Sequence, residues 1–442
     1  MIAVVGGGPA GRTAAIRLAN GGAEVLLIDK GGLGGQCLHH GCMVVSALSD
    51  IARLLDSARQ MERLGIIDRV PEIDFPCVLA EMRNVQATIR RVLEEETRSA
   101  GVEICSGKEA FVDGRKLILE GEERETAAIL IATGSKPAVP AIPGAGLPGV
   151  ITPHTLGELE KLPGRIAIVG GGVVAAEFAY IFRQFGSEVE ILCRSEFLKH
   201  VDERVRRSAR AELADVGIEE NAPVDAIERA GNTLHVEVRN RPEREVDAVL
   251  LAAGLEPNTA LVRGIEKGQS GAILVDAKMR TSVPGVYAAG DVTGGPYLTP
   301  VARRQGTIAA DAILGRPAGE ERLPPVPQTI KLRNDHTFCD LAGSEEIITF
   351  GFPSPSGSGS FWWVPERYTG SSSLTIEPDG RIVGFYAGAP CTSLLGPYLA
   401  YLLRDGVGVE ALEDLVEVHP STDGIYGLIR YAANWLNRQP RA

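Results

Sequence analysis

A glycine-rich turn between a strand and a helix occurs twice in the 442-residue chain, and this repeat most constrains the fold. Residues 2–6 read as a buried strand, followed by "GGGPAG", a helical pattern and a strand ending at Asp29. Gly6, Gly8 and Gly11 match G-x-G-x-x-G, which brings backbone N–H groups close to a pyrophosphate at a helix N-terminus. Asp29 is placed to accept ribose hydrogen bonds. We therefore expect a Rossmann-like dinucleotide-binding unit.

The second turn lies in "GRIAIVGGGVVAAEFAYIFRQFGSEVEILCR", where Gly170 and Gly172 repeat the pattern. Two such sites imply two different dinucleotides. The second strand here leads into Arg194 instead of an acid, with Lys199 and His200 close by. These cations would suit the 2′-phosphate of NADPH, although Arg194 could also be a solvated charge at a strand end, and NADH stays open.

The formal net charge of −12 disfavours nucleic acid and anionic membranes as partners. The first residues, "MIAVVGGGPAG", lack a basic segment followed by a long apolar stretch, and no later segment approaches the ~20 apolar residues of a membrane span. We expect a cytoplasmic protein.

The chain has seven cysteines, of which five stand singly in the sequence. Cys37 and Cys42 are the exception, because they lie close together in "GGQCLHHGC". Such a set does not make the disulfide framework of a small secreted domain. His39 and His40 lie between the two cysteines, but a metal site would want a second Cys or His pair at ligand spacing, and none is present. We therefore expect no metal.

Six markers occur in order along the chain: "GGGPAG", "GGLGGQCLHHGC", "IATGSKP", "VGGGVVAAEFA", "VYAAGDVTGG" and "VHPSTDG". Asp291, in the marker "VYAAGDVTGG", could by itself be only a helix cap. Together, and over essentially the whole chain, the markers resemble the flavin disulfide oxidoreductases that include dihydrolipoamide dehydrogenase, glutathione reductase and mercuric reductase.

The resemblance implies an α/β fold with two Rossmann-like dinucleotide-binding domains, for FAD and NAD(P), and a C-terminal α+β dimerisation domain. The implied boundaries are 1–148 for the FAD-binding domain, 149–267 for the NAD(P)-binding domain, 268–322 for a return segment of the FAD domain and 323–442 for the interface domain. The positions that match FAD contacts are Gly6, Gly8, Gly11, Asp29, Lys30, Gly35, Gln36, Thr133, Gly134 and Asp291. The positions that match contacts of NADPH or NADH are Gly170, Gly172, Arg194 and Gly254.

The resemblance also makes Cys37 and Cys42 an active-site disulfide. Cys42 would lie against the flavin, and Cys37 would exchange with a substrate disulfide. A bridge closing so short a loop removes little entropy from the unfolded chain, so its structural value is small. The apolar spacing of "HGCMVVSALSDIARLL" predicts a helix beginning near the pair, whose N-terminal end would stabilise a thiolate.

His419 precedes a proline and, taken alone, would be a turn residue. The resemblance implies that it crosses the interface of a homodimer and serves the neighbouring subunit's thiols as general acid and base. Relatives orient this histidine with a glutamate five residues on, where this chain has Gly424, and Asp423 is the only acid nearby.

A second departure follows Cys42. Relatives carry a proline and then basic residues, whereas this chain continues with Val44, Val45 and Ser46. The missing lysine pairs in relatives with a glutamate that matches Glu177. Glu177 would then be unpaired, protonated or turned toward another partner.

The C-terminal part should begin after a proline-rich linker at 316–327. Residues 358–390 alternate like antiparallel strands, with one of Trp362 and Trp363 in the core and the other at the dimer contact.

The function expected from the sequence is electron transfer between NAD(P)H and a small-molecule or lipoyl-protein disulfide, most like dihydrolipoamide dehydrogenase. A mercuric-reductase-like NADPH enzyme is the alternative within this class. An electron-transfer flavoprotein subunit that acts on a protein partner is the alternative outside it.

Overall fold

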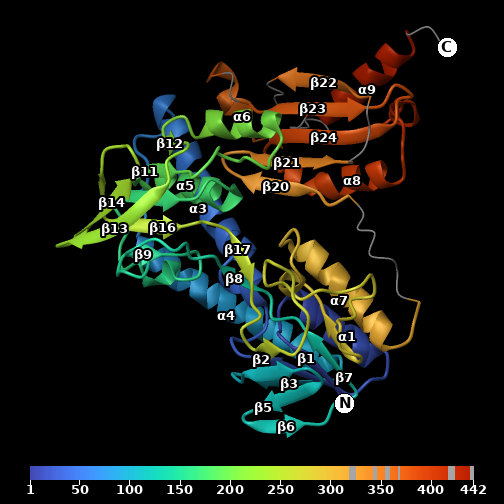
Figure 1. Cartoon of the computed structure of the whole chain (residues 1–442). Coiled ribbons are helices and arrows are strands. Elements are labelled where there is room, and N and C mark those ends of the chain that lie inside the picture. The colour runs from blue at the N-terminus through green and yellow to red at the C-terminus, as the bar shows by residue number, and fades with distance from the viewer. Residues whose placement is uncertain (318–324, 342–345, 354–358, 367–368, 417–423, 439–442) are drawn as a thin grey trace.

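The computed structural model describes residues 1–317, 325–341, 346–353, 359–366, 369–416 and 424–438, and Figure 1 shows their arrangement. Most of the predicted linker therefore lies outside the described residues. Within the described part of the chain, no helix combines the length and the apolar character needed to cross a membrane.

The first sheet is parallel and has the strand order β19-β7-β1-β2-β3. Its strands are β1 (Ile2–Val5), β2 (Val25–Asp29), β3 (Val102–Ser106), β7 (Ala128–Ile131) and β19 (Val286–Ala288). One face packs on α1 (Pro9–Asn20) and α7 (Thr299–Ile313), which lie side by side (Figure 1). The other face packs on a small sheet of β4 (Ala110–Asp113), β5 (Lys116–Leu119), β6 (Glu122–Arg124) and β18 (Val262–Arg263). Because both faces are covered, β1 and β7 are apolar and buried throughout.

The second sheet repeats this plan with the order β12-β11-β10-β16-β9. Its parallel strands are β9 (Val150–Ile151), β10 (Arg165–Val169), β11 (Glu188–Leu192), β12 (Gly217–Glu219) and β16 (Ala248–Leu251). α5 (Val173–Phe185) joins β10 to β11, as the second glycine turn predicts. An antiparallel sheet of β13 (Val224–Ala230), β14 (Thr233–Val238) and β15 (Arg244–Val246) covers one face. β8 (Ser135–Pro137) pairs with β17 (Leu255–Pro257) between the two units.

The third main sheet is antiparallel, with the order β20-β21-β24-β23-β22. Its strands are β20 (Gln328–Lys331), β21 (Asp335–Asp340), β22 (Ile348–Pro353), β23 (Ser371–Ile376) and β24 (Ile382–Ala389). α8 (Gly396–Arg404) and α9 (Ile425–Leu436) pack on one face, and α6 (Glu203–Glu212), from the second unit, lies near β21 and β24 (Figure 1). The fold class, α/β with parallel sheets and a further C-terminal domain, is confirmed.

The prediction of antiparallel strands over 358–390 is confirmed for β23 and β24 and is wrong at the start of the segment. Phe361–Glu366 is a 3-10 helix, in which Trp363 is buried and Trp362 is 48% exposed. β24 is buried at every position because the sheet has helices against it on both sides.

One short helix and two long ones connect these layers. α2 (Gly35–His39) is followed by α3 (Cys42–Arg63), and α4 (Phe75–Ser99) leads back to the first sheet. α3 packs along α5, and Val44, Val45 and Leu48 share one core with Phe178 of α5 and Ile330 of β20. The helix that begins at Cys42 therefore contacts both the second unit and the C-terminal sheet.

Candidate active site

The first glycine turn lies at the carboxyl end of β1. A Cβ on Gly6 would approach the Ala132 carbonyl oxygen to 2.2 Å, and a Cβ on Gly11 would approach the Gly6 oxygen to 1.9 Å. These glycines therefore allow β1, α1 and β7 to pack closely. Gly8 is the N-cap of α1, and no side chain caps the helix there. The first N–H groups of α1 are left for an anionic ligand, which fits the pyrophosphate of a dinucleotide.

Asp29 closes this unit at the end of β2. Its carboxylate accepts hydrogen bonds from the backbone N–H groups of Gly7 and, at 2.9 Å, of Gly31. Burial raises its pKa. Each carboxylate oxygen has a further lone pair, so the predicted ribose contact fits the geometry. Lys30 is 74% exposed and paired with Glu109 at 2.7 Å, and its contact with FAD stays a prediction.

Gln36, Ser135 and Asp291 come together from three distant segments. The Ser135 hydroxyl donates to Asp291 Oδ2 at 2.6 Å and lies 3.1 Å from Gln36 Oε1. Asp291 begins a 3-10 helix after β19, and its charge acts on Cys37. The predicted FAD residues Gln36 and Asp291 therefore lie beside the cysteine pair. Ser135 was missed because a serine after a buried strand carries no signal of its own.

Thr133 and Gly134 form hydrogen bonds with Asn258, which follows β17. The Thr133 hydroxyl donates to the Asn258 carbonyl at 2.7 Å, and Asn258 N–H donates to the Gly134 carbonyl at 2.9 Å. Gly35 lies against Gly8, since a Cβ on Gly35 would come within 2.7 Å of the Gly8 Cα. The start of α2 therefore sits directly over the first glycine turn.

Cys37 lies in α2, and Cys42 is the first residue of α3, as the sequence predicted. The two thiols share a hydrogen bond that lowers the pKa of Cys37 to about 6 and raises that of Cys42. Thr299 and Arg303, near the N-terminus of α7, also lower the pKa of Cys37. The Thr299 hydroxyl lies 4.0 Å from Cys42 Sγ. The pair can therefore hold a thiolate near neutral pH, the form that attacks disulfides.

The roles of the two thiols stay a prediction. Cys42 is exposed in the chain and Cys37 is half-buried, whereas the resemblance assigns substrate exchange to Cys37. Thr299 and Arg303 could not be found from the sequence, because they reach the pair only through the packing of α7 on α1.

The two histidines between the cysteines each contact another group. His39 Nε2 lies 3.2 Å from the Leu33 carbonyl oxygen, and the His40 ring stacks on His154 with 4.2 Å between ring centroids. Burial lowers the pKa of His154 to about 4. Among the described residues, no three His, Cys, Asp or Glu side chains are arranged to hold a metal ion.

The second glycine turn has the same construction as the first. A Cβ on Gly170 would come within 2.2 Å of the Ala252 carbonyl oxygen, while a Cβ on Gly172 would meet no atom within 4 Å. Gly172 is the N-cap of α5 and again leaves it uncapped. Gly254 has a φ of +106° and accepts a hydrogen bond from Ala138 N–H. The open space in front of α5 fits a second pyrophosphate.

Exposed cations lie beyond the end of β11. Arg194, Lys199 and His200 are all exposed, and the Arg194 guanidinium makes no ion pair within the described residues. The neighbouring acids are already neutralised by arginines: Glu196 by Arg206, Glu219 by Arg241 and Glu220 by Arg210. The surface there is available to a phosphate.

Glu177 lies on α5 and is only 8% exposed. Its Oε1 accepts a hydrogen bond from Lys331 N–H at 3.0 Å, and burial raises its pKa to about 7. Of the three states expected from the sequence, the structure shows a carboxyl turned toward another partner.

His419 and Asp423 lie outside the described residues. Gly424 is the N-cap of α9 and has a φ of +68°, a conformation that favours glycine. This backbone geometry is a physical reason for the absence of a glutamate at that position.

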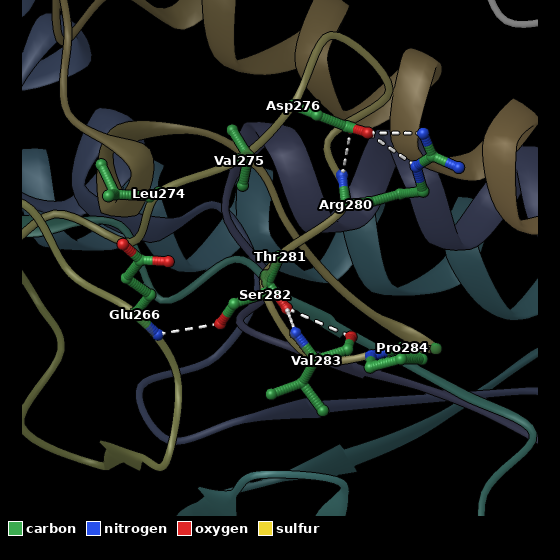
Figure 2. Close-up of a pocket in the computed structure, with 10 residues that line it drawn as sticks. Glu266, Leu274, Val275, Asp276, Arg280, Thr281, Ser282, Val283 and Pro284 are labelled. Atoms are coloured by element: carbon green, nitrogen blue, oxygen red, sulfur yellow. Dashed lines mark hydrogen bonds and ion pairs between the residues drawn. The ribbon is translucent and has the colours of Figure 1, made fainter.

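A surface cleft lies apart from the thiol pair. This cleft of about 640 Å³ is lined by Glu266, by residues 274–276 and by residues 280–285 (Figure 2). Asp276 pairs with Arg280 at 2.7 Å, and the Ser282 hydroxyl accepts from Glu266 N–H at 3.1 Å. None of the cysteines and none of the glycine-turn residues lines this cleft, so we place the active site at the thiol pair.

Comparisons with known proteins agree with this geometry. A family model described as pyridine nucleotide-disulphide oxidoreductase matches residues 1–306. The dihydrolipoyl dehydrogenase of Chlamydia pneumoniae is 33% identical over 443 residues, which cover 96% of this chain and 94% of that enzyme. The mercuric reductase of Lysinibacillus sphaericus is 30% identical over 323 residues, covering 71% of this chain and 59% of that enzyme. The structure of LpdA from Mycobacterium tuberculosis superposes with a TM-score of 0.86 at 26% identity, covering 98% of this chain and 99% of that one.

The family model spans both glycine turns, the cysteine pair and Asp291. Relatives and solved structures extend the match to nearly the full length. The chain therefore belongs to the pyridine nucleotide-disulphide oxidoreductases, flavoenzymes that use FAD and NAD(P)H.

Proposed function

We propose that this oxidoreductase carries electrons between NAD(P)H and a dithiol/disulfide substrate through Cys37 and Cys42, with chemistry most like dihydrolipoamide dehydrogenase. The observation that carries the proposal is the position of the thiol pair beside Asp291 and above the first glycine turn. The near full-length match to a dihydrolipoyl dehydrogenase supports the substrate class.

FAD, once bound, would relay two electrons between NAD(P)H and the cysteine pair. In the direction of disulfide reduction, the Cys37 thiolate attacks one sulfur of the substrate, breaks its S–S bond and releases the first thiolate. The Cys42 thiolate then attacks Cys37 Sγ, releases the second thiolate and closes the Cys37–Cys42 disulfide. Two protons, one given up by the Cys42 thiol and one from solution, convert the released thiolates to thiols. Thr299 and Arg303 stabilise the attacking thiolate.

The proton donor in this proposal is His419 of a second copy of the chain, so the working form is a homodimer. The family is typically homodimeric, which supports this arrangement. His419→Ala should slow disulfide turnover by ~10²-fold or more, the usual scale for a lost general acid or base. An unchanged rate would mean that another group supplies the proton.

NADPH is the proposed nicotinamide cofactor. The guanidinium of Arg194, which has no ion-pair partner in the part of the chain that the structure describes, and the neutralised acids around it support recognition of a 2′-phosphate. Arg194→Gln should lower kcat/KM for NADPH by about tenfold or more and leave that for NADH nearly unchanged. Equal losses for both cofactors would contradict a role in phosphate recognition.

The substrate proposal is tested by stopped-flow oxidation of NADPH with lipoamide, glutathione disulfide or Hg(II) as acceptor. Fast turnover with lipoamide, lost in Cys37→Ser, is the expected result. No turnover with lipoamide would remove the leading proposal.

Mercuric-reductase-like activity is the second candidate, because a mercuric reductase is among the relatives at 30% identity. The chain covers only 59% of that enzyme, which weakens the analogy. Turnover with Hg(II) and none with lipoamide would favour it. Inactivity with all three acceptors would point instead to a protein partner.

A further inference from the structure

Exposed arginines lie on the helix that borders the thiol pair. Thr299 is the first residue of α7, and its hydroxyl lies 4.0 Å from Cys42 Sγ. Arg303 follows four residues later, so it lies on the same face of α7, about 6 Å further along the helix axis. Arg303 is exposed, and so is Arg304 beside it. A cationic surface therefore begins one helical turn from the reactive sulfurs.

The charge on this part of α7 is not neutralised within the chain. Among the described residues, the guanidinium groups of Arg303 and Arg304 make no hydrogen bond and no ion pair. The single acid of α7, Asp311, lies about two turns away and is already paired with Arg17 at 2.8 Å. The helix therefore presents two positive charges that are available to an anion from outside.

The thiols beside this surface are open to a substrate. Cys42 is exposed and Cys37 is half-buried. The acid that acts on Cys37, Asp291, accepts a hydrogen bond from the Ser135 hydroxyl at 2.6 Å and is not paired with Arg303. Arg303 lowers the pKa of Cys37, which agrees with its position on the face of Thr299. A disulfide that approaches the pair therefore passes the guanidinium.

We propose that Arg303, supported by Arg304, selects small disulfides that carry a carboxylate or another anionic group close to the S–S bond. The guanidinium pairs with that anion while Cys37 attacks the disulfide. The whole chain has a formal net charge of −12, which repels an acidic protein surface and favours a small molecule as the partner of this local cation. The inference deepens the proposed function and rests on it, since it names a substrate feature for the same thiol pair.

The test compares two chromogenic disulfides, the dicarboxylate dithiobis(nitrobenzoate) and the neutral dithiodipyridine. In each reaction the Cys37 thiolate attacks the probe, breaks its S–S bond and releases one thiolate. The Cys42 thiol then gives up its proton, and its thiolate attacks Cys37 Sγ and releases the second thiolate. The probe gains two electrons, and the cysteine pair becomes a disulfide.

Stopped-flow absorbance measures each rate on the anaerobic, FAD-loaded protein, which is first reduced with dithiothreitol and then freed of it. Cys77 and Cys391 are exposed and would react as well, so every protein in the comparison carries Cys77→Ser and Cys391→Ser. The kinetic phase that is lost in Cys37→Ser reports the pair. Because Arg303 lowers the pKa of Cys37, its loss changes both rates, and the ratio of the two rates removes this common effect.

Arg303→Gln should lower the ratio of the dithiobis(nitrobenzoate) rate to the dithiodipyridine rate by about threefold or more, the scale of an exposed ion pair. Arg304→Gln should lower it less, because Arg304 is turned by about 100° around the helix. Arg303→Lys keeps the charge and should retain the greater part of the ratio. Added salt should lower the ratio more in the parent protein than in Arg303→Gln, because salt screens exposed charges.

Arg316→Gln is the matched control, because Arg316 is an exposed arginine beyond the other end of α7 and has no ion pair in the described part of the chain. It should leave the ratio unchanged. Equal losses of both rates in Arg303→Gln, or no loss of either, would overturn the inference and leave the proposed electron path intact. An enzyme that is inactive with lipoamide would instead contradict the leading substrate of the proposed function, while the ratio of the two probe rates would still decide the role of Arg303.

Discussion

Thr299 shows how a single hydroxyl outside every sequence motif reaches the reactive sulfurs. It lies 4.0 Å from Cys42 Sγ and lowers the pKa of Cys37. Thr299→Val keeps the shape and removes the hydroxyl, so the thiolate should form at higher pH. The measurement is the pH dependence of iodoacetamide alkylation of the pair.

Thr307→Val, about two turns along the same helix, is the control, because the Thr307 hydroxyl bonds only to the Arg303 carbonyl among the described residues. An identical pH profile for Thr299→Val and the unmodified protein would show that the hydroxyl does not act on the thiols.

The two glycines of the second turn should respond differently to alanine. Gly170 has a φ of +144° and no room for a Cβ, so Gly170→Ala should destabilise the fold by at least about 1–3 kcal/mol. Gly172 has room, so Gly172→Ala should melt like the unmodified protein. It should raise the KM for NADPH about tenfold, since its methyl group would enter the open space proposed for the pyrophosphate. Thermal melts and steady-state kinetics check both. An unchanged KM in Gly172→Ala would place the dinucleotide elsewhere.

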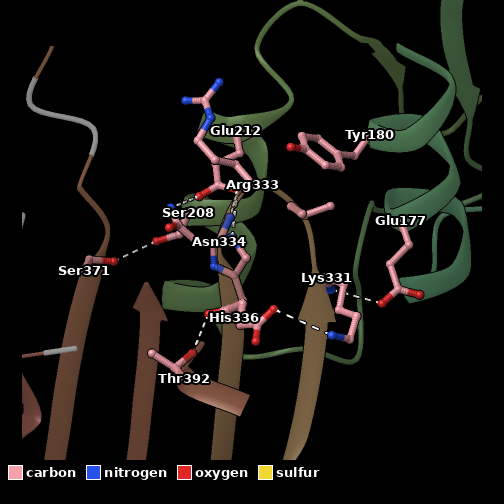
Figure 3. A network of polar contacts seen from close by, with 12 residues as sticks. Glu177, Tyr180, Ser208, Glu212, Lys331, Arg333, Asn334, His336, Ser371 and Thr392 are labelled. Atoms are coloured by element: carbon pink, nitrogen blue, oxygen red, sulfur yellow. Dashed lines mark hydrogen bonds and ion pairs between the residues drawn. The ribbon is translucent and has the colours of Figure 1, made fainter. Parts of the chain in front are cut away.

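At the scale of elements, a buried ion pair joins α6 of the second unit to β21 of the C-terminal sheet. His336 Nε2 lies 3.2 Å from Glu212 Oε2, and its Nδ1 lies 3.0 Å from the Tyr386 hydroxyl (Figure 3 shows His336 and Glu212). Asn334 donates to Glu212 as well. Although burial opposes it, the negative partners raise the pKa of His336 to about 10.

The sign of the pH dependence follows from this raised pKa. The pair stabilises the fold fully below the unfolded pKa of about 6.5 and loses its effect as pH rises through about 10. His336→Gln should lower the free energy of unfolding by about 3–5 kcal/mol near pH 6, and this loss should shrink toward pH 10. Urea unfolding at several pH values measures it. His235→Gln, at an exposed pair with Glu243, is the control with little effect. A cost independent of pH would exclude a charged His336.

The elements whose shape depends on nearby residues were predictable, whereas the contacts between elements were not. The glycine spacing predicted both nucleotide turns because tight turns and uncapped helix starts are local properties. Ser135, Thr299 and Lys331 gave no signal, since each reaches the site through packing between segments far apart in sequence. The burial of β24 was missed for the same reason: the alternation of its sequence does not reveal that helices from two different units lie against the sheet.

At the scale of the whole molecule, α8 and the turn before it present an apolar face. Leu394, Tyr398 and Tyr401 are 69%, 74% and 54% exposed and share the spacing of one helix face. The proposed dimer should bury them, so Tyr398→Glu should sediment as a monomer and lose disulfide turnover while keeping bound FAD. Analytical ultracentrifugation measures the oligomeric state. Tyr287→Glu is not a suitable control, because Tyr287 packs on the core of the first unit. A dimeric Tyr398→Glu would place the interface elsewhere.

In the proposed mechanism, electrons pass from the flavin through Cys37 and Cys42. An anaerobic titration of the purified yellow protein with NADPH, followed through the flavin spectrum, tests it most directly. A long-wavelength charge-transfer band should form after two electrons and should be lost in Cys42→Ser. Bleaching to reduced flavin without that band would show that electrons bypass Cys37 and Cys42, which would rule out the proposed mechanism.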